Sequence, residues 1–153
     1  DLGFQVEILD ISACDRETAQ AKIFQSKLLY VSGGNTFYLL QELKKKQLLP
    51  LIKEQIADGM VYVGESAGAV ITVEDIDYIR LMDDKEVAGE LSDTVALKEA
   101  DFYLLPHVGE EPFAESAQSI LDTYGDKLNL LPLNNRQAVL VEGEEVKVLE
   151  EDK

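Results

Sequence analysis

The sequence predicts an α/β fold with a mainly parallel sheet and helices on both of its faces. The first observation is the order of the segments: short apolar runs alternate with segments of helical periodicity, which is the order that generates parallel strands joined by helices. The second is that these apolar runs are continuous, as in strands buried on both faces. The third is size, because 153 residues with 46% hydrophobic content suit one domain, so we expect a single domain over residues 1–153.

The elements of the first part follow from apolar patterns and helix-end signals. β-branched and aromatic residues over 4–11 favour a strand. Residues 15–25 predict a short amphipathic helix and residues 27–31 a buried strand. We expect a further helix over 37–46, because apolar residues recur at helical spacing up to three lysines, which suit the negative end of a helix dipole.

The later elements are indicated in the same way. Residues 50–58 predict a helix with Pro50 in its first turn and Gly59 just beyond its end, and residues 60–63 predict the next strand. An acidic, irregular stretch follows over 74–93. The remaining predicted elements are a strand over 102–105, a helix over 113–124, and strands over 137–141 and 146–149. The last two strands predict an antiparallel hairpin at the sheet edge.

Charge and composition narrow the classes of function. The 14 basic and 30 acidic residues give 14 − 30 = −16, which argues against nucleic acid or an anionic membrane as partner. No apolar run approaches the roughly 18 residues of a membrane span, and no leader precedes the first apolar segment, so we expect a cytoplasmic protein. Cys14 is the only cysteine, and we interpret it as structural.

A candidate nucleophile follows the strand predicted over 60–63. The run Gly64-Glu65-Ser66-Ala67-Gly68 has small residues on both sides of Ser66, as a sharp strand-to-helix turn requires. The backbone N–H of Ala67 would begin a helix, where an unsatisfied donor can stabilise the oxyanion that forms when Ser66 attacks a carbonyl. This placement predicts a serine hydrolase.

A candidate base follows another predicted strand. A serine hydroxyl needs a base to accept its proton, and His107 is the only histidine in the chain. It comes directly after Pro106 and the strand predicted over 102–105, at the kind of sheet edge where α/β enzymes carry their sites. A carboxylate would orient the imidazole, and spacing alone does not choose among the candidates Asp75, Asp77, Asp83 and Asp84.

The glycine-containing loop over residues 32–36 has three possible interpretations. It lies between a predicted strand and a predicted helix, and its glycines could free N–H groups for a phosphate. However, it lacks the lysine of a P-loop and the spacing of a dinucleotide motif. Alternatively, Gly34 supplies a second oxyanion donor facing Ser66, or the loop is only a tight turn.

Three motifs in this order resemble peptidase E, the aspartyl dipeptidase, and more distantly cyanophycinase. The resemblance runs from about residue 4 to residue 149. The motifs are Val31-Ser32-Gly33-Gly34-Asn35-Thr36, Gly64-Glu65-Ser66-Ala67-Gly68-Ala69 and Leu105-Pro106-His107.

The resemblance implies a flavodoxin-like sheet related to class I glutamine amidotransferases, with serine in place of the usual cysteine. The family triad would fall on Ser66, His107 and an aspartate after the elbow, for which we predict Asp83, with Asp84 one residue away. Gly34 and Ala67 would form the oxyanion hole. The implied substrate-binding residues are Asn35, Thr36 and Arg80.

Two departures from the family pattern bear on assembly and substrate. The family chain begins with a further strand and helix of roughly 50 residues, and this chain begins after them, which would expose a sheet edge and favour association. The family also carries arginines on the helix after the histidine, expected to bind an N-terminal aspartate, and residues 113–124 contain none. The remaining basic candidates are Arg80, Lys127 and Arg136.

We therefore predict a serine peptidase that hydrolyses short peptides, with Asp-X dipeptides as the implied class, through an acyl-enzyme. No metal or organic cofactor is implied, because one histidine and one cysteine do not build a typical zinc site. The alternatives are an esterase or amidase on another small acyl substrate, or an inactive binding module of the same fold. We expect a small peptide as ligand, no nucleic acid or membrane partner, and a monomer or homodimer.

Overall fold

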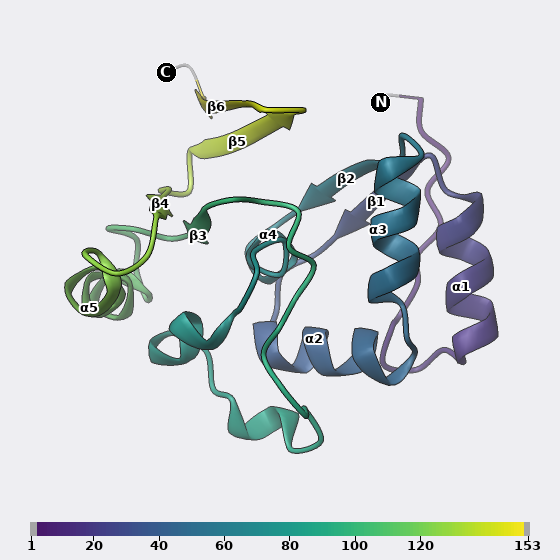
Figure 1. The fold of residues 1–153 in the computed structure, drawn as a ribbon, viewed down its shortest axis with the longest axis horizontal. Helices are drawn as coiled ribbons and strands as arrows, with labels where there is room; N and C mark the ends of the chain where they lie inside the picture. Colours follow the sequence, from purple (N-terminus) through teal and green to yellow (C-terminus); the bar gives the residue numbers. More distant parts are fainter. Residues whose placement is uncertain (1–2, 152–153) are drawn as a thin grey trace.

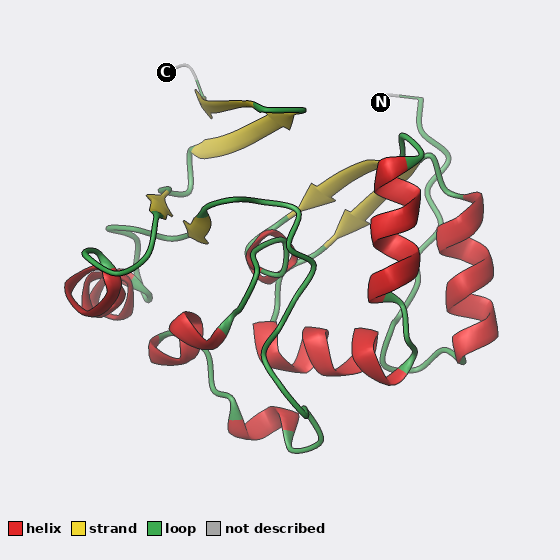
Figure 2. Cartoon of the chain, in the orientation of Figure 1, coloured by secondary structure: helices red, strands yellow, loops and turns green. Residues whose placement is uncertain are grey.

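The α/β class is confirmed, with two parallel strand pairs and a C-terminal antiparallel hairpin. The computed structural model describes residues 3–151. Helices lie beside β1–β2 and beside β3–β4, and the hairpin extends away from the rest of the chain (Figures 1 and 2). The pairs are β1 (Leu28–Val31) with β2 (Val61–Gly64), β3 (Tyr103–Leu105) with β4 (Leu130–Pro132), and β5 (Gln137–Glu142) with β6 (Glu145–Glu150).

The helices begin and end close to the predicted positions because their caps are encoded locally. Asp15 caps the first helix by accepting a 2.7 Å hydrogen bond from Thr18 N, and Asn35 caps the second by accepting one of 2.9 Å from Tyr38 N. The helices are α1 (Arg16–Gln25), α2 (Thr36–Lys45), α3 (Leu49–Ala57), α4 (Ala67–Val70), η1 (Asp77–Leu81), η2 (Glu86–Ala88) and α5 (Ala114–Tyr124).

The core lies where α2, α3 and the segment after the Ser66 turn meet. Phe37 and Leu40 of α2, Ile52 of α3, and Ile71 and Leu105 are completely buried and belong to one contiguous apolar cluster. Tyr78 adds a polar anchor by donating a hydrogen bond to the carbonyl of Leu104 at the end of β3. The core therefore supports the ends of β2 and β3, from which the candidate catalytic residues emerge.

The first predicted strand is absent. Residues 3–10 form no strand, and Val6 and Ile8 are 79% and 90% exposed. The physical reason is that a strand needs a partner, and in the described part of the chain β1 pairs only with β2. The alternating apolar residues of this segment have the composition of a strand, but within residues 3–151 no neighbouring strand is present to pair with the segment and bury them.

The β1–β2 sheet is packed on one face only. Leu29, Val31 and Tyr62 pack against the core, whereas the alternate residues remain exposed. This differs from the expectation of strands buried on both faces, because within residues 3–151 no helix covers the second face. On the exposed face, Leu28 lies beside Val61 and Tyr30 lies beside Val63. These four side chains are 37% to 55% exposed.

Two further findings concern single elements. The short strand β4 was not predicted, because three residues that end in a proline carry little strand pattern. Across residues 3–151, no helix combines the length and the apolar character that crossing a membrane requires.

Candidate active site

Ser66 occupies a sharp turn between β2 and α4. Its backbone has φ 49° and ψ −111°, a conformation that non-glycine residues rarely adopt. The flanking glycines are required by contact: a Cβ on Gly64 would lie 2.5 Å from the carbonyl oxygen of Gly68, and one on Gly68 would lie 2.1 Å from that of Val31. The Gly-x-Ser-x-Gly spacing thus serves to bring α4 against β1 and β2.

The side chain of Tyr62 stabilises this turn. Its hydroxyl donates a 2.6 Å hydrogen bond to the carbonyl of Gly68. Burial raises the pKa of Tyr62 well above its usual value, so the hydroxyl stays protonated and remains a donor. The N–H of Gly68 donates to the carbonyl of Glu65 at 2.9 Å. The turn that presents Ser66 is therefore fixed from both ends.

His107 lies within hydrogen-bond distance of Ser66. Its Nε2 is 2.9 Å from Ser66 Oγ, although 41 positions separate the two residues in sequence. His107 follows β3 and Pro106, and its φ of 63° again places a non-glycine residue in the left-handed region. The structure brings together the nucleophile and base that the strand-end argument paired.

The third position beside the imidazole is occupied by Asn135. Its Oδ1 lies 2.6 Å from His107 Nδ1. With Nδ1 protonated and donating to Asn135, Nε2 is left to accept the proton of Ser66. Neighbouring contacts fix the turn that carries Asn135: Asn134 N donates to Gln137 Oε1 at 3.1 Å and Arg136 N donates to Asn134 Oδ1 at 2.9 Å.

The structure does not bring the predicted Asp83 to His107. Asp83 Oδ2 accepts hydrogen bonds from Thr36 N at 2.7 Å and Thr36 Oγ1 at 2.5 Å, so this carboxylate is bound to the first turn of α2. The alternative, Asp84, accepts from Glu86 N at 2.8 Å. Both aspartates thus anchor the acidic stretch in this structure.

The predicted substrate-binding side chains are engaged in internal contacts. Asn35 caps α2 and also donates its Nδ2 to the carbonyl of Asp84 at 2.8 Å. Thr36 is bound to Asp83 and is 1% exposed. Arg80 pairs with Asp77 at 3.3 Å and donates to Tyr124 Oη at 3.2 Å. These residues connect the acidic stretch to α2 and α5.

The glycine loop adjoins the nucleophile directly. A Cβ on Gly33 would lie 3.3 Å from Ser66 Cβ, and Gly34 has φ 144°. On the other side, Ala67 N–H begins α4, in the first turn where amides have no partner within the helix. The start of α4 and the glycine loop thus lie on either side of Ser66. These are the two segments expected to carry the oxyanion donors, the N–H groups of Ala67 and Gly34.

Phe113 lies against the imidazole. Its ring stacks on that of His107, with centroids 4.9 Å apart and an interplanar angle of 27°. Phe113 is fixed at the start of α5, where its carbonyl accepts hydrogen bonds from Ser116 Oγ at 3.0 Å and Ala117 N at 2.8 Å. Sequence reasoning missed both Phe113 and Asn135; the signal for Asn135 was its place after a parallel strand, like Ser66 and His107.

An exposed pair borders the nucleophile. Tyr30 Oη donates a 2.6 Å hydrogen bond to Oε2 of Glu65, the residue before Ser66. This bond to the carboxylate raises the pKa of Tyr30. The contact ties β1 to the turn after β2 on the exposed face of the sheet.

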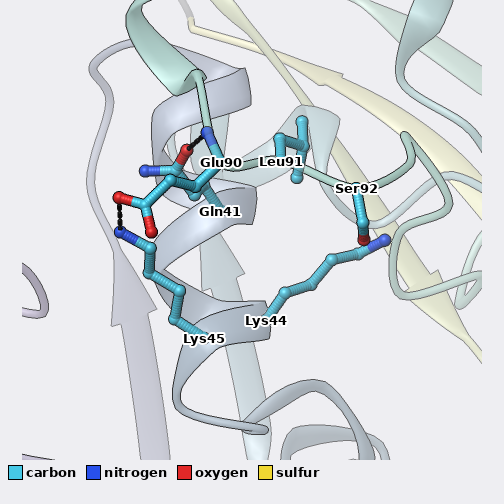
Figure 3. A pocket seen from close by; sticks show the side chains of 6 residues that line it. All are labelled: Gln41, Lys44, Lys45, Glu90, Leu91 and Ser92. Atoms are coloured by element: carbon cyan, nitrogen blue, oxygen red, sulfur yellow. Dashed lines mark hydrogen bonds and ion pairs between the residues drawn. The ribbon is translucent and has the colours of Figure 1, made fainter.

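A surface hollow formed by described residues borders the site. A hollow of about 410 Å³ at the base of the hairpin is lined by Asn135, Arg136 and residues of β5 and β6. Another of about 210 Å³ lies at the end of α2 and is lined by Gln41, Lys44, Lys45 and residues 90–92 (Figure 3). Lys45 is paired there with Glu90 at 2.7 Å, so its charge is already compensated.

No metal centre is formed in the part of the chain from residue 3 to residue 151. Within that part, no three His, Cys, Asp or Glu side chains gather closely enough to hold an ion.

Comparisons with known proteins give a consistent picture. The model of peptidase family S51 matches residues 1–149. The chain is 44% identical to an uncharacterized peptidase of Pasteurella multocida over 93% of this chain and 69% of the relative. It is 40% identical to peptidase E of Shewanella sp. (strain W3-18-1) over 52% of this chain and 32% of that protein. A crystal structure of a candidate peptidase E protein from Listeria monocytogenes EGD-e superposes with a TM-score of 0.92 at 41% identity, covering 99% of this chain and 73% of that chain.

Proposed function

The chain belongs to peptidase family S51, and from this premise we propose that it is a serine-type peptidase that hydrolyses short peptides through Ser66 and His107. Membership of the family supports a hydrolase of the peptidase class. The observation that carries the serine mechanism is the 2.9 Å contact between Ser66 Oγ and His107 Nε2 at the strand-to-helix turn.

In the proposed reaction, Ser66 Oγ attacks the carbonyl carbon of the first peptide bond while His107 Nε2 takes the hydroxyl proton. Asn135 Oδ1 accepts a hydrogen bond from Nδ1–H, which fixes the tautomer and the ring orientation. The oxyanion that forms on the substrate carbonyl would be bound by the backbone N–H groups of Ala67 and Gly34 on either side of Ser66.

The second half of the reaction returns the enzyme to its starting state. His107 gives its proton to the leaving amine, which breaks the carbon–nitrogen bond and leaves an acyl ester on Ser66. Water then donates a proton to His107 and adds to the ester, and the carboxylic acid departs as Oγ regains its proton. His107 is thus the only proton carrier that the cycle requires.

The substrate class that we propose is the dipeptide, including those with an N-terminal aspartate. Relatives named peptidase E support this class. Asn35 and Thr36 would act by holding the loop that carries Gly34, since their side chains bind Asp84 and Asp83. Of the basic residues considered, Arg136 adjoins Asn135 in sequence and lines the hollow beside it, which makes it the candidate for binding an aspartate side chain.

The experiment is hydrolysis of Asp-Leu and Ala-Leu by the wild-type protein, Ser66→Ala and His107→Ala, with labelling of Ser66 by a fluorophosphonate. Cleavage that disappears in both variants, together with labelling of Ser66 in the wild type, supports the serine mechanism. A wild-type protein that neither cleaves nor labels would count against it.

One observation favours a second candidate, an esterase or amidase on another small acyl substrate. Arg80 is already paired with Asp77, and α5 carries no arginine to bind an acidic substrate. If Ser66 labels but neither dipeptide is cleaved, a panel of p-nitrophenyl esters tests this alternative directly. An inactive binding module predicts no labelling at all.

A further inference from the structure

The imidazole of His107 has no carboxylate partner in the described structure. In a Ser-His-Asp arrangement, the aspartate stabilises the imidazolium that forms as the serine proton is taken. Here the group at Nδ1 is the neutral amide of Asn135, and Asp83 is bound to Thr36. The amide can orient the ring, but it brings no negative charge to the cation that the reaction creates.

Phe113 is placed to supply part of that stabilisation. The face of an aromatic ring carries negative potential and attracts a cation within about 6 Å of its centroid. The imidazole centroid lies 4.9 Å from that of Phe113, with the rings inclined by only 27°. The two rings are thus stacked at a small angle, while the two ring nitrogens of His107 contact Ser66 and Asn135.

We propose that Phe113 is a positioning residue of the proposed peptidase reaction, which stabilises the imidazolium of His107 by stacking and so takes over part of the role of a missing carboxylate. Its anchoring supports this role, because the Phe113 backbone is held at the start of α5 by Ser116 and Ala117 and by a 2.9 Å hydrogen bond from Phe113 N to the carbonyl of Glu110. The backbone that carries the ring is therefore held by contacts within the chain.

Charged residues also stand near in sequence to the residues of the site, and the variants leave them in place. They stand on each segment that carries the site: Glu65 beside Ser66, Glu110 and Glu111 after His107, Glu115 on α5, and Arg136 beside Asn135. The variants described below retain all of them. In the single variants at position 113, a change in the titration of His107 can therefore be assigned to that position.

The test uses the fact that His107 is the only histidine. Its ring resonances can be followed against pH by NMR in the full chain, without a substrate. Phe113→Leu keeps an apolar side chain over the imidazole but removes the aromatic face. We expect the midpoint of the imidazole titration to move down by about half a unit to one unit, and kcat to fall by roughly 3-fold to 10-fold with little change in KM.

If Phe113→Leu folds poorly, Phe113→Met, which also lacks an aromatic face, replaces it with the same expected shift, and two further variants extend the test. Phe113→Tyr retains the ring and should titrate close to the wild type. In the double variant Phe113→Leu with Asn135→Asp, a carboxylate replaces the lost stabilisation, so the midpoint should rise above that of Phe113→Leu and kcat should partly recover. The matched control is Phe24→Leu, a largely exposed phenylalanine on α1, which should leave the midpoint unchanged.

The results separate this inference from the proposed function. A folded Phe113→Leu protein with the wild-type midpoint and kcat would overturn the inference, and so would a Phe113→Tyr protein that behaves like the leucine variant. Failure of Ser66 to label with a fluorophosphonate in the wild type would instead count against the proposed function. The NMR titration still reports on the stack in that case.

Discussion

At the scale of single residues, the site depends on which polar group reaches Nδ1 of His107. Asn135 Oδ1 does so at 2.6 Å, whereas Asp83 lies against Thr36. An aspartate was the expected partner because carboxylates are the usual choice, and the chain offers many of them. The amide can fill the orienting role, because it accepts the same hydrogen bond.

If Asn135 is the residue that orients His107, substitutions at Asn135 and at Asp83 should affect activity differently. Asn135→Ala removes the acceptor that fixes the tautomer, so we expect kcat for the best dipeptide to fall by about tenfold to a hundredfold. Asp83→Asn keeps an oxygen that accepts from Thr36, so it should retain most of the activity. Steady-state kinetics of both proteins provides the measurement, and a larger loss in Asp83→Asn would support an aspartate as the third residue.

The glycines around Ser66 allow a sharp stability prediction. A methyl group on Gly68 would lie 2.1 Å from the Val31 carbonyl, so Gly68→Ala should destabilise the protein by about 3 kcal/mol or more, or prevent folding. Gly89→Ala is the matched control, because nothing lies within 4 Å of its added Cβ and its φ is −61°. Urea denaturation of the two variants compares them; equal midpoints would contradict the packing argument.

Part of the site was predictable from sequence at this scale. Ser66 and His107 each follow a strand directly, and both carry residue types with a clear chemical role. Asn135 follows a strand of only three residues that ends in Pro132, so its position at a strand end left little trace. Phe113 required the tertiary contact itself, since nothing in its local pattern marks it as a partner of His107.

At the scale of elements, α2 combines several functions. Its first turn binds Asp83 through Thr36, and its last turn carries the lysines that pair with Glu42. Glu42 is 5% exposed. Burial acts to raise its pKa, but hydrogen bonds from Lys46 and Gln41 and the nearby lysine charges outweigh burial, so its pKa lies below the ordinary 4.5.

The depressed pKa of Glu42 sets the direction of a pH effect. A carboxylate whose pKa is lower in the folded state stabilises the fold above about pH 4.5, and this contribution is lost as the pH falls through the folded pKa. Glu42→Gln should therefore lower the free energy of unfolding by about 1 to 3 kcal/mol at neutral pH, and the difference should shrink in acid.

Urea titrations of Glu42→Gln between pH 3 and pH 7 test this expectation. Glu54→Gln on the exposed face of α3 is the control, because it changes the net charge by the same amount. A pH-independent difference between Glu42→Gln and the wild type would show that lost packing, and not ionisation, is the cause.

Helices were easier to predict than strands for a physical reason. Asp15 and Asn35 encode their caps within three residues of sequence, so α1 and α2 begin where the pattern places them. A strand needs a partner from elsewhere in the chain. Residues 3–10 have the composition of a strand but no partner strand among the described residues, and apart from the half-buried Leu9 their side chains are exposed.

At the scale of the whole molecule, charge dominates the surface. The net charge of −16 remains after the basic residues are counted, so pairs such as Lys98 with Glu74 do not reduce this excess of negative charge. Mutual repulsion of like charges opposes the compact state, and salt screens it over a Debye length of about 10 Å at 0.1 M.

Added salt should therefore stabilise the fold. Raising KCl from low to moderate concentration at pH 7 is expected to increase Tm by about 2 to 4 °C for each ~1 kcal/mol of repulsion relieved. Differential scanning calorimetry at matched protein concentration gives the measurement. A Tm that falls with KCl would show that the surface ion pairs contribute more than the net repulsion.

The overall arrangement was only partly readable from the sequence. The order of segments predicts parallel pairs, and β1–β2 and β3–β4 are parallel. Whether a sheet face is buried depends on which helices pack against it. The exposed side chains of Leu28, Tyr30, Val61 and Val63 show that a continuous apolar run alone does not predict burial on both faces.

Ser66 and His107 both have positive φ angles, of 49° and 63°. Such a conformation costs a side-chain-bearing residue about 1 to 3 kcal/mol, and glycine adopts it without that cost. A library of variants ranked only by resistance to heat would therefore tend to replace the two residues to which we assign the proposed reaction. Directed evolution of this protein needs a readout of catalysis in every round, because its most heat-resistant descendants are expected to include inactive ones.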